Sequence, residues 1–88
     1  MLAEVYVELG DFEQAWTMAR AAHDTAQRAG NQLDLAEATF LLGKLHASRG
    51  DTEQAERLLD DAATRFERLG HTDRVAEIRR QLNALSNQ

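Results

Sequence analysis

Three histidines are the side chains in this sequence best suited to metal binding or proton transfer near neutral pH. His23, His46 and His71 fall in three separate predicted elements, and none forms an HExxH motif or a pair at i, i+4. His46 lies 40 residues after Tyr6 in a repeated pattern, which indicates a half-buried residue between helices. The alternative is a metal-binding or catalytic role. We expect no metal site and no cofactor.

Two neighbouring carboxylates, Asp60 and Asp61, could in principle share a proton. Adjacent residues on a helix do not face each other, so this pair does not form a general acid/base dyad. We interpret both as part of a solvated helix face. Asp61 can pair with Arg65, and Glu53 with Arg57, at helical spacing.

The C-terminal third is rich in arginine: Arg65, Arg68, Arg74, Arg79 and Arg80. Acidic residues interleave with these cations, which indicates a paired, solvated face, and the last three are expected on the wet outer side of the last helix. The alternative, a nucleic-acid patch, disagrees with the formal net charge of −5. We therefore expect no direct nucleic-acid binding, and the charge favours basic or neutral partners.

Trp16 is the only tryptophan, and its counterpart in the repeated pattern is Glu56. The repeat therefore does not require an aromatic residue at this position. We interpret Trp16 as covering the neighbouring helix. The alternative is an exposed anchor for a partner or for a second copy.

The elements that position these residues repeat along the chain with a shift of 40 positions. Nine residues of the first part recur in the second, namely Leu2, Gly10, Asp11, Glu13, Gln14, Ala15, Ala22, Arg28 and Gly30, which match Leu42, Gly50, Asp51, Glu53, Gln54, Ala55, Ala62, Arg68 and Gly70. Periods in this range indicate solenoid arrays, in which each unit buries its apolar face against its neighbours.

The matching residues suit the ends of helices. Glycines in Gly10-Asp11 and Gly50-Asp51 can take the left-handed conformation that ends a helix. The aspartates that follow are predicted N-caps. Gln14 and Gln54 stand three residues later, as a capping box requires.

Each copy also contains a small residue, a large residue three positions later, Gly-Asp, and two spaced alanines. These are Ala3, Tyr6, Gly10-Asp11, Ala15 and Ala22, and again Gly43, His46, Gly50-Asp51, Ala55 and Ala62. The pattern resembles the tetratricopeptide repeat family, whose usual period is about 34 residues. The longer period here predicts longer helices and is similar to repeats in bacterial signalling and transcriptional regulators. Thr39 departs from the family by replacing a large aromatic residue.

The resemblance implies an all-α fold of antiparallel helix–turn–helix repeats, stacked as a right-handed solenoid of about five helices. The expected helices are Met1–Leu9, Asp11–Ala29, Leu33–Arg49, Asp51–Leu69 and Asp73–Leu85. We divide the single domain, 1–88, into repeat 1 (1–30), repeat 2 (31–70) and a capping helix or the start of a third repeat (71–88). A complete first helix would begin before Met1, so we expect a fragment of a longer protein.

The composition is consistent with a small cytoplasmic domain. The 88 residues include no Cys and no Pro, so neither disulfides nor thiolate metal sites are available. No apolar run approaches 18 residues and no secretory signal is visible, so we expect no membrane contact.

In tetratricopeptide arrays the first helix of each repeat lines a concave groove. The resemblance therefore implies partner-binding residues at Glu4, Val7, Glu8, Glu37, Phe40, Lys44, Ser48, Glu77 and Arg80. All are expected off the core stripe, which on the third helix is Leu35, Ala38, Leu42 and Leu45. As a set they predict a mostly acidic groove with Phe40 as its apolar anchor.

These expectations favour a non-catalytic module that binds a basic or amphipathic peptide or helix, within a larger signalling or transcriptional regulator. Family members that grip a C-terminal carboxylate use Lys, Asn and Arg at positions that here hold Glu4, Leu41, Glu77 and Gln81, so we exclude that activity. The alternative function is structural self-association. A homodimer would form through the first hairpin, with the contact near Ala3, Tyr6, Val7 and Trp16. We expect no enzyme activity, because no set of titratable residues converges.

Overall fold

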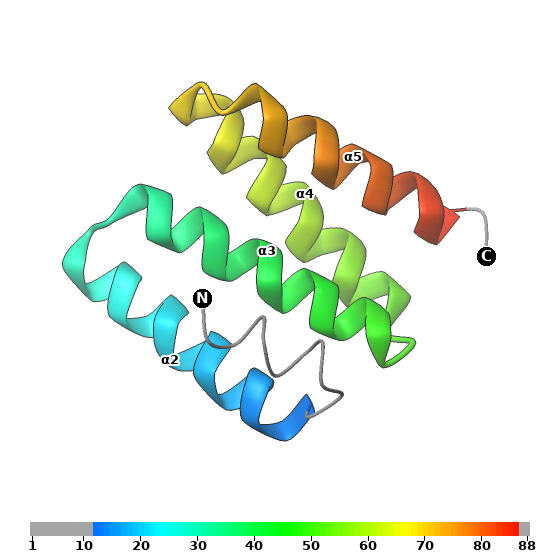
Figure 1. The fold of residues 1–88 in the computed structure, drawn as a ribbon, viewed down its shortest axis with the longest axis horizontal. Helices are drawn as coiled ribbons and strands as arrows, with labels where there is room; N and C mark the ends of the chain where they lie inside the picture. Colours follow the sequence, from blue (N-terminus) through cyan, green and yellow to red (C-terminus); the bar gives the residue numbers. More distant parts are fainter. Residues whose placement is uncertain (1–11, 87–88) are drawn as a thin grey trace.

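The computed structural model describes residues 12–86, which form four α-helices joined by short turns (Figure 1). The helices are α2 (Phe12–Ala29), α3 (Gln32–Ser48), α4 (Thr52–Leu69) and α5 (Thr72–Ser86). They lie side by side in chain order, each antiparallel to the one before it. The all-α class is confirmed, and each helix begins and ends within one residue of its predicted bounds. The helix expected over Met1–Leu9 lies outside the described residues.

The three turns between these helices share one construction. Gly30, Gly50 and Gly70 have φ values of 69°, 83° and 78°, in the left-handed region that favours glycine. The residue after each glycine donates its N–H to the carbonyl five positions earlier, as His71 does to Phe66 at 2.9 Å. This is the Schellman arrangement, and it reverses the chain within about three residues. The predicted helix end at Gly50 is therefore confirmed.

The N-terminal caps of α3 and α4 differ from each other. The side chain of Asn31 accepts a hydrogen bond from the backbone N–H of Asp34 at 3.1 Å, as an N-cap should. Asp51 occupies the N-cap position of α4, but its side chain makes no capping hydrogen bond. Its ψ of 65° lies outside the usual extended region, and its Oδ2 lies 3.2 Å from Nδ1 of His46 instead. The predicted capping box at Asp51 and Gln54 was therefore wrong. Asp11 lies outside the described residues.

The hydrophobic core consists of two clusters that share helix α3. One cluster joins α2 to α3 through Ala15, Ala19, Leu41, Leu42 and Leu45. The other joins α3, α4 and α5 through Ala36, Phe40, Ala55, Leu59, Ala62, Ala63, Phe66, Ile78 and Leu85. Because α3 contributes to both clusters, it is apolar on most sides, as expected of a central helix. The predicted stripe of α3 is buried throughout, but it is only part of the buried surface.

Helices α3 and α4 approach most closely at Gly43. A Cβ atom at this position would lie 2.8 Å from Cδ2 and 2.9 Å from Cγ of Leu59, which is fully buried. The backbone nitrogen of Leu59 would be only 3.3 Å away. Gly43 is therefore required by close packing between helices and not by its backbone conformation.

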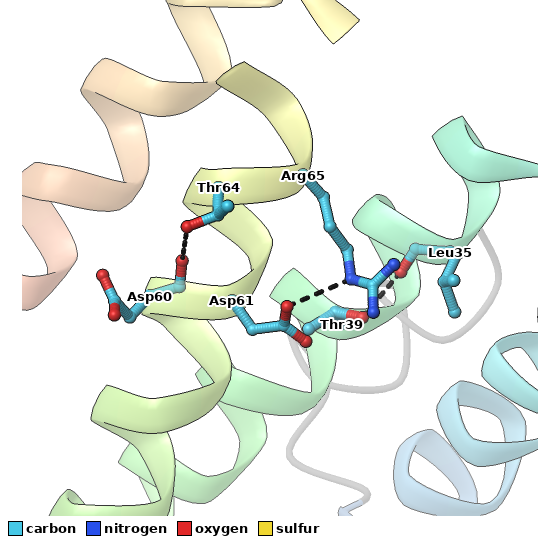
Figure 2. Close-up of polar contacts among 6 residues, drawn as sticks. All are labelled: Leu35, Thr39, Asp60, Asp61, Thr64 and Arg65. Carbon is cyan, nitrogen blue, oxygen red and sulfur yellow. Dashed lines mark hydrogen bonds and ion pairs between the residues drawn. The ribbon is translucent and has the colours of Figure 1, made fainter. Parts of the chain in front are cut away.

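Polar side chains also lie between α3 and α4 (Figure 2). Thr39 is fully buried, and its hydroxyl donates to the carbonyl of Leu35 at 2.7 Å. Arg65 of α4 lies across this part of α3, with Nε 3.2 Å from Oδ1 of Asp61. That nitrogen is buried and lacks an aligned hydrogen bond, so the contact with Asp61 acts as an ion pair. The predicted Asp61–Arg65 pair is confirmed.

Candidate functional site

The partner-binding residues predicted on α3 divide into exposed and buried side chains. Glu37 and Lys44 are half-buried and Ser48 is exposed, so all three reach the surface. Phe40 is only 2% exposed and belongs to the cluster with Ala36 and Phe66. The prediction that Phe40 is an exposed anchor was therefore wrong. Ala36 and Phe40 are four residues apart on the side of α3 that faces α4 and α5, and this second contact buries the ring.

Arg74 of α5 links the exposed faces of α3 and α5. Its guanidinium lies 3.5 Å from Glu37 of α3 and 3.2 Å from Glu77 of its own helix. The same group lies over the rings of Phe40 and Phe66, at 5.9 and 6.0 Å from their centroids. The side chain is half-buried, although we expected it on the wet outer side of the last helix. The i, i+3 spacing of Arg74 and Glu77 could have indicated one ion pair, but no local signal indicated Glu37.

We name this surface the α3–α5 face and define it as Glu37, Lys44, Ser48, Arg74, Glu77 and Arg80. Its two carboxylates both pair with Arg74, and Nζ of Lys44 lies 4.6 Å from the ring centroid of Phe40. Arg80 is exposed. The described part of the predicted groove therefore carries cations as well as acids. The buried ring of Phe40 lies beneath Lys44 and Arg74. Glu4, Val7 and Glu8 lie outside the described residues.

Trp16 sits at the junction of α2 and α3. Its ring meets that of His46 edge-on, with centroids 4.7 Å apart and an interplanar angle of 82°. The guanidinium groups of Arg20 and Arg49 lie 5.9 and 5.8 Å from its centroid. Both aromatic residues are half-buried, which confirms that Trp16 covers the neighbouring helix and that His46 lies between helices. The other residues of the predicted self-association contact, Ala3, Tyr6 and Val7, lie outside the described residues.

A surface hollow of about 480 Å³ adjoins Trp16 at this junction. It is lined by Phe12, Glu13, Trp16, Thr17, Leu45 and Arg49. Its described walls are partly apolar and partly charged. Such a lining suits contact with another molecule.

Side chains that could do chemistry are dispersed over residues 12–86. No group of three or more His, Cys, Asp or Glu in this range could hold a metal ion. The expected Glu53–Arg57 ion pair is present, at 3.1 Å, on the exposed side of α4. Among the helices of the same range, none is both long and apolar enough to cross a membrane.

The chain forms antiparallel helices that pack in chain order, and its pattern repeats every 40 residues. This arrangement defines a helical-repeat protein. A family model described as tetratricopeptide repeat matches residues 1–68, which is more than half of the chain. The chain therefore belongs to the tetratricopeptide repeat family, as the 40-residue pattern predicted. Repeats of this family typically act as non-catalytic modules for protein–protein interaction. No curated protein and no solved structure matches the chain significantly.

Proposed function

We propose that this chain is a non-catalytic module that binds a peptide or helix of a partner protein along the α3–α5 face. We place it within a larger signalling or transcriptional regulator. The observation that carries the proposal is the contact of Arg74 with both Glu37 and Glu77. This contact joins the exposed sides of α3 and α5 into one surface, with Glu37, Arg74 and Glu77 held in position before a partner arrives. Such preorganisation reduces the entropy lost on binding.

The charges of this face favour an amphipathic partner that carries both acidic and basic side chains. The face contains the carboxylates Glu37 and Glu77, and the cations Lys44, Arg74 and Arg80. A purely basic peptide would meet these three cations, and a purely acidic one would meet both carboxylates. A helix with alternating charges can align with both signs.

The same geometry argues against capture of a free C-terminal carboxylate. That activity uses Lys, Asn and Arg side chains at positions that here include Leu41 and Glu77. Leu41 is 2% exposed and part of the core, and the Glu77 carboxylate lies next to Arg74. Neither residue can donate to an incoming carboxylate, and a negative charge at Glu77 would repel it.

Selection from a displayed peptide library, followed by titration of the enriched peptides, tests this proposal. We expect Lys44→Glu combined with Arg80→Glu to weaken the selected peptides by at least about tenfold, because both changes reverse charges on the face. Arg68→Glu is the control for a charge reversal outside the face, since Arg68 is exposed on α4. Circular dichroism should show unchanged helicity in all three proteins. Equal binding by the double variant and the control would refute the assignment.

A further inference from the structure

Two cations beside Trp16 lack acidic partners among the described residues 12–86. No carboxylate within residues 12–86 forms an ion pair with Arg20 or Arg49, although most other arginines in that range are paired. Both guanidinium groups lie within 6 Å of the centroid of one indole ring. Each guanidinium therefore has no carboxylate partner in that range, and an incoming acidic group would stabilise its charge. We name these three residues the α2 patch.

Helix α4 carries acidic residues at the positions equivalent to Trp16 and Arg20. The 40-residue repeat places Glu56 where α2 has Trp16, and Asp60 where α2 has Arg20. Their neighbours Glu53 and Asp61 are neutralised by arginines one turn later. By contrast, neither Glu56 nor Asp60 forms a side-chain ion pair with another residue in the described range 12–86. We name Glu56 and Asp60 the α4 patch.

The two patches lie along the same edge of the molecule. Helices α2 and α4 run in the same direction on either side of α3, so their N-terminal turns lie at the same end of the stack (Figure 1). Because the repeat equates the two pairs of positions, both patches also lie on the same side of their helices. A second copy turned about a two-fold axis at this edge would bring each patch against the opposite patch of its neighbour.

We propose that the chain forms a two-fold symmetric dimer in which the α2 patch of each copy binds the α4 patch of the other. Charge complementarity identifies the occupant as a second copy, because one chain supplies cations in the α2 patch and carboxylates in the α4 patch. Closed two-fold dimers are also the commonest symmetric assemblies. This contact differs from the first-hairpin dimer expected from sequence, since Trp16 faces α4 of the partner. It is separate from the α3–α5 face, so peptide binding and dimerisation can be tested independently.

Charge reversal followed by mixing gives a direct test. The first variant, Arg20→Glu with Arg49→Glu, makes both patches acidic, and the second, Glu56→Arg with Asp60→Arg, makes both basic. Sedimentation equilibrium should show a dimer for the unmodified chain and monomers for each variant alone. An equimolar mixture should form a mixed dimer, because every contact again joins opposite charges. Emission from Trp16, the only tryptophan, should change on mixing.

The control variant is Arg68→Glu with Arg80→Glu. It changes the net charge by as much as the first variant and should leave the dimer intact. Raising NaCl from low to high concentration should weaken the unmodified dimer at least about tenfold, and this measurement does not depend on the folding of any variant. A monomeric unmodified chain, a salt-independent dimer or a mixture that stays monomeric would overturn the proposal. Retention of a single-stranded dT oligonucleotide by the unmodified chain, but not by the first variant, would overturn it in favour of nucleic-acid binding.

Discussion

The close contact between Gly43 and Leu59 predicts that Gly43→Ala changes the free energy of unfolding in a direction set by the side chain at position 59. In the native sequence, Gly43→Ala would place a methyl group 2.8 Å from Cδ2 of Leu59, well inside van der Waals contact. Leu59 is fully buried, so its side chain cannot relieve this contact by turning into solvent. Overpacking of this kind costs about 1–3 kcal/mol, whereas alanine is favoured over glycine inside a helix by about 1 kcal/mol. We therefore expect a net loss of about 1 kcal/mol in the free energy of unfolding.

In a Leu59→Ala background the same change should become stabilising. The side-chain atoms that would clash with the new methyl group are then absent, so the helix preference of about 1 kcal/mol acts alone. Leu59→Ala itself should cost about 2–5 kcal/mol, because it leaves a cavity between α3 and α4. The two backgrounds should therefore differ by about 2 kcal/mol in the effect of Gly43→Ala.

Urea denaturation followed by circular dichroism at the helix band measures all four proteins of this cycle. A stabilising effect of Gly43→Ala in the native background would refute the clash. An equal destabilisation in both backgrounds would show that the cost arises elsewhere, for example at another contact of α3.

Three further predictions concern helix caps, turns and the core, and thermal or urea unfolding measures each. Asn31→Ala should cost about 1 kcal/mol because it removes a capping hydrogen bond. Asp51→Ala should cost less, because the side chain of Asp51 makes no capping hydrogen bond. Equal losses in the two variants would contradict this difference. Gly70→Ala should cost about 1–2 kcal/mol at a φ of 78°, and Gly70→Asn should cost less. Phe40→Ala should cost about 3–5 kcal/mol as a core residue, whereas a surface anchor would lose under about 0.5 kcal/mol.

The sequence predicted those features that depend on neighbouring residues. Helix ends at Gly30, Gly50 and Gly70 follow from the local need for a left-handed residue, and all three are present. The periodic apolar residues gave helix bounds for the same reason. Ion pairs at i, i+4, such as Asp61 with Arg65, are equally local and were also correct.

Predictions failed where residues distant in sequence decide the outcome. Phe40 lies off the single apolar stripe of α3, but α3 has helices on more than one side, so a second stripe is buried. Arg74 reaches Glu37 on another helix, and no spacing within α5 could reveal that contact. Asp51 turns towards His46 instead of capping its own helix. One stripe per helix is therefore a poor assumption for a helix in the middle of a stack.

The position of α3 in both core clusters limits the order in which the helices can unfold. Among the described helices, α2 rests mainly on α3, so α2 can detach while α3, α4 and α5 keep their shared cluster. The reverse order is unavailable, because loss of α3 removes the support of α2. Trp16 emission senses the junction of α2 and α3, whereas the helical signal senses every helix. Where α2 detaches first, the fluorescence midpoint therefore falls below the helical midpoint in a denaturation series.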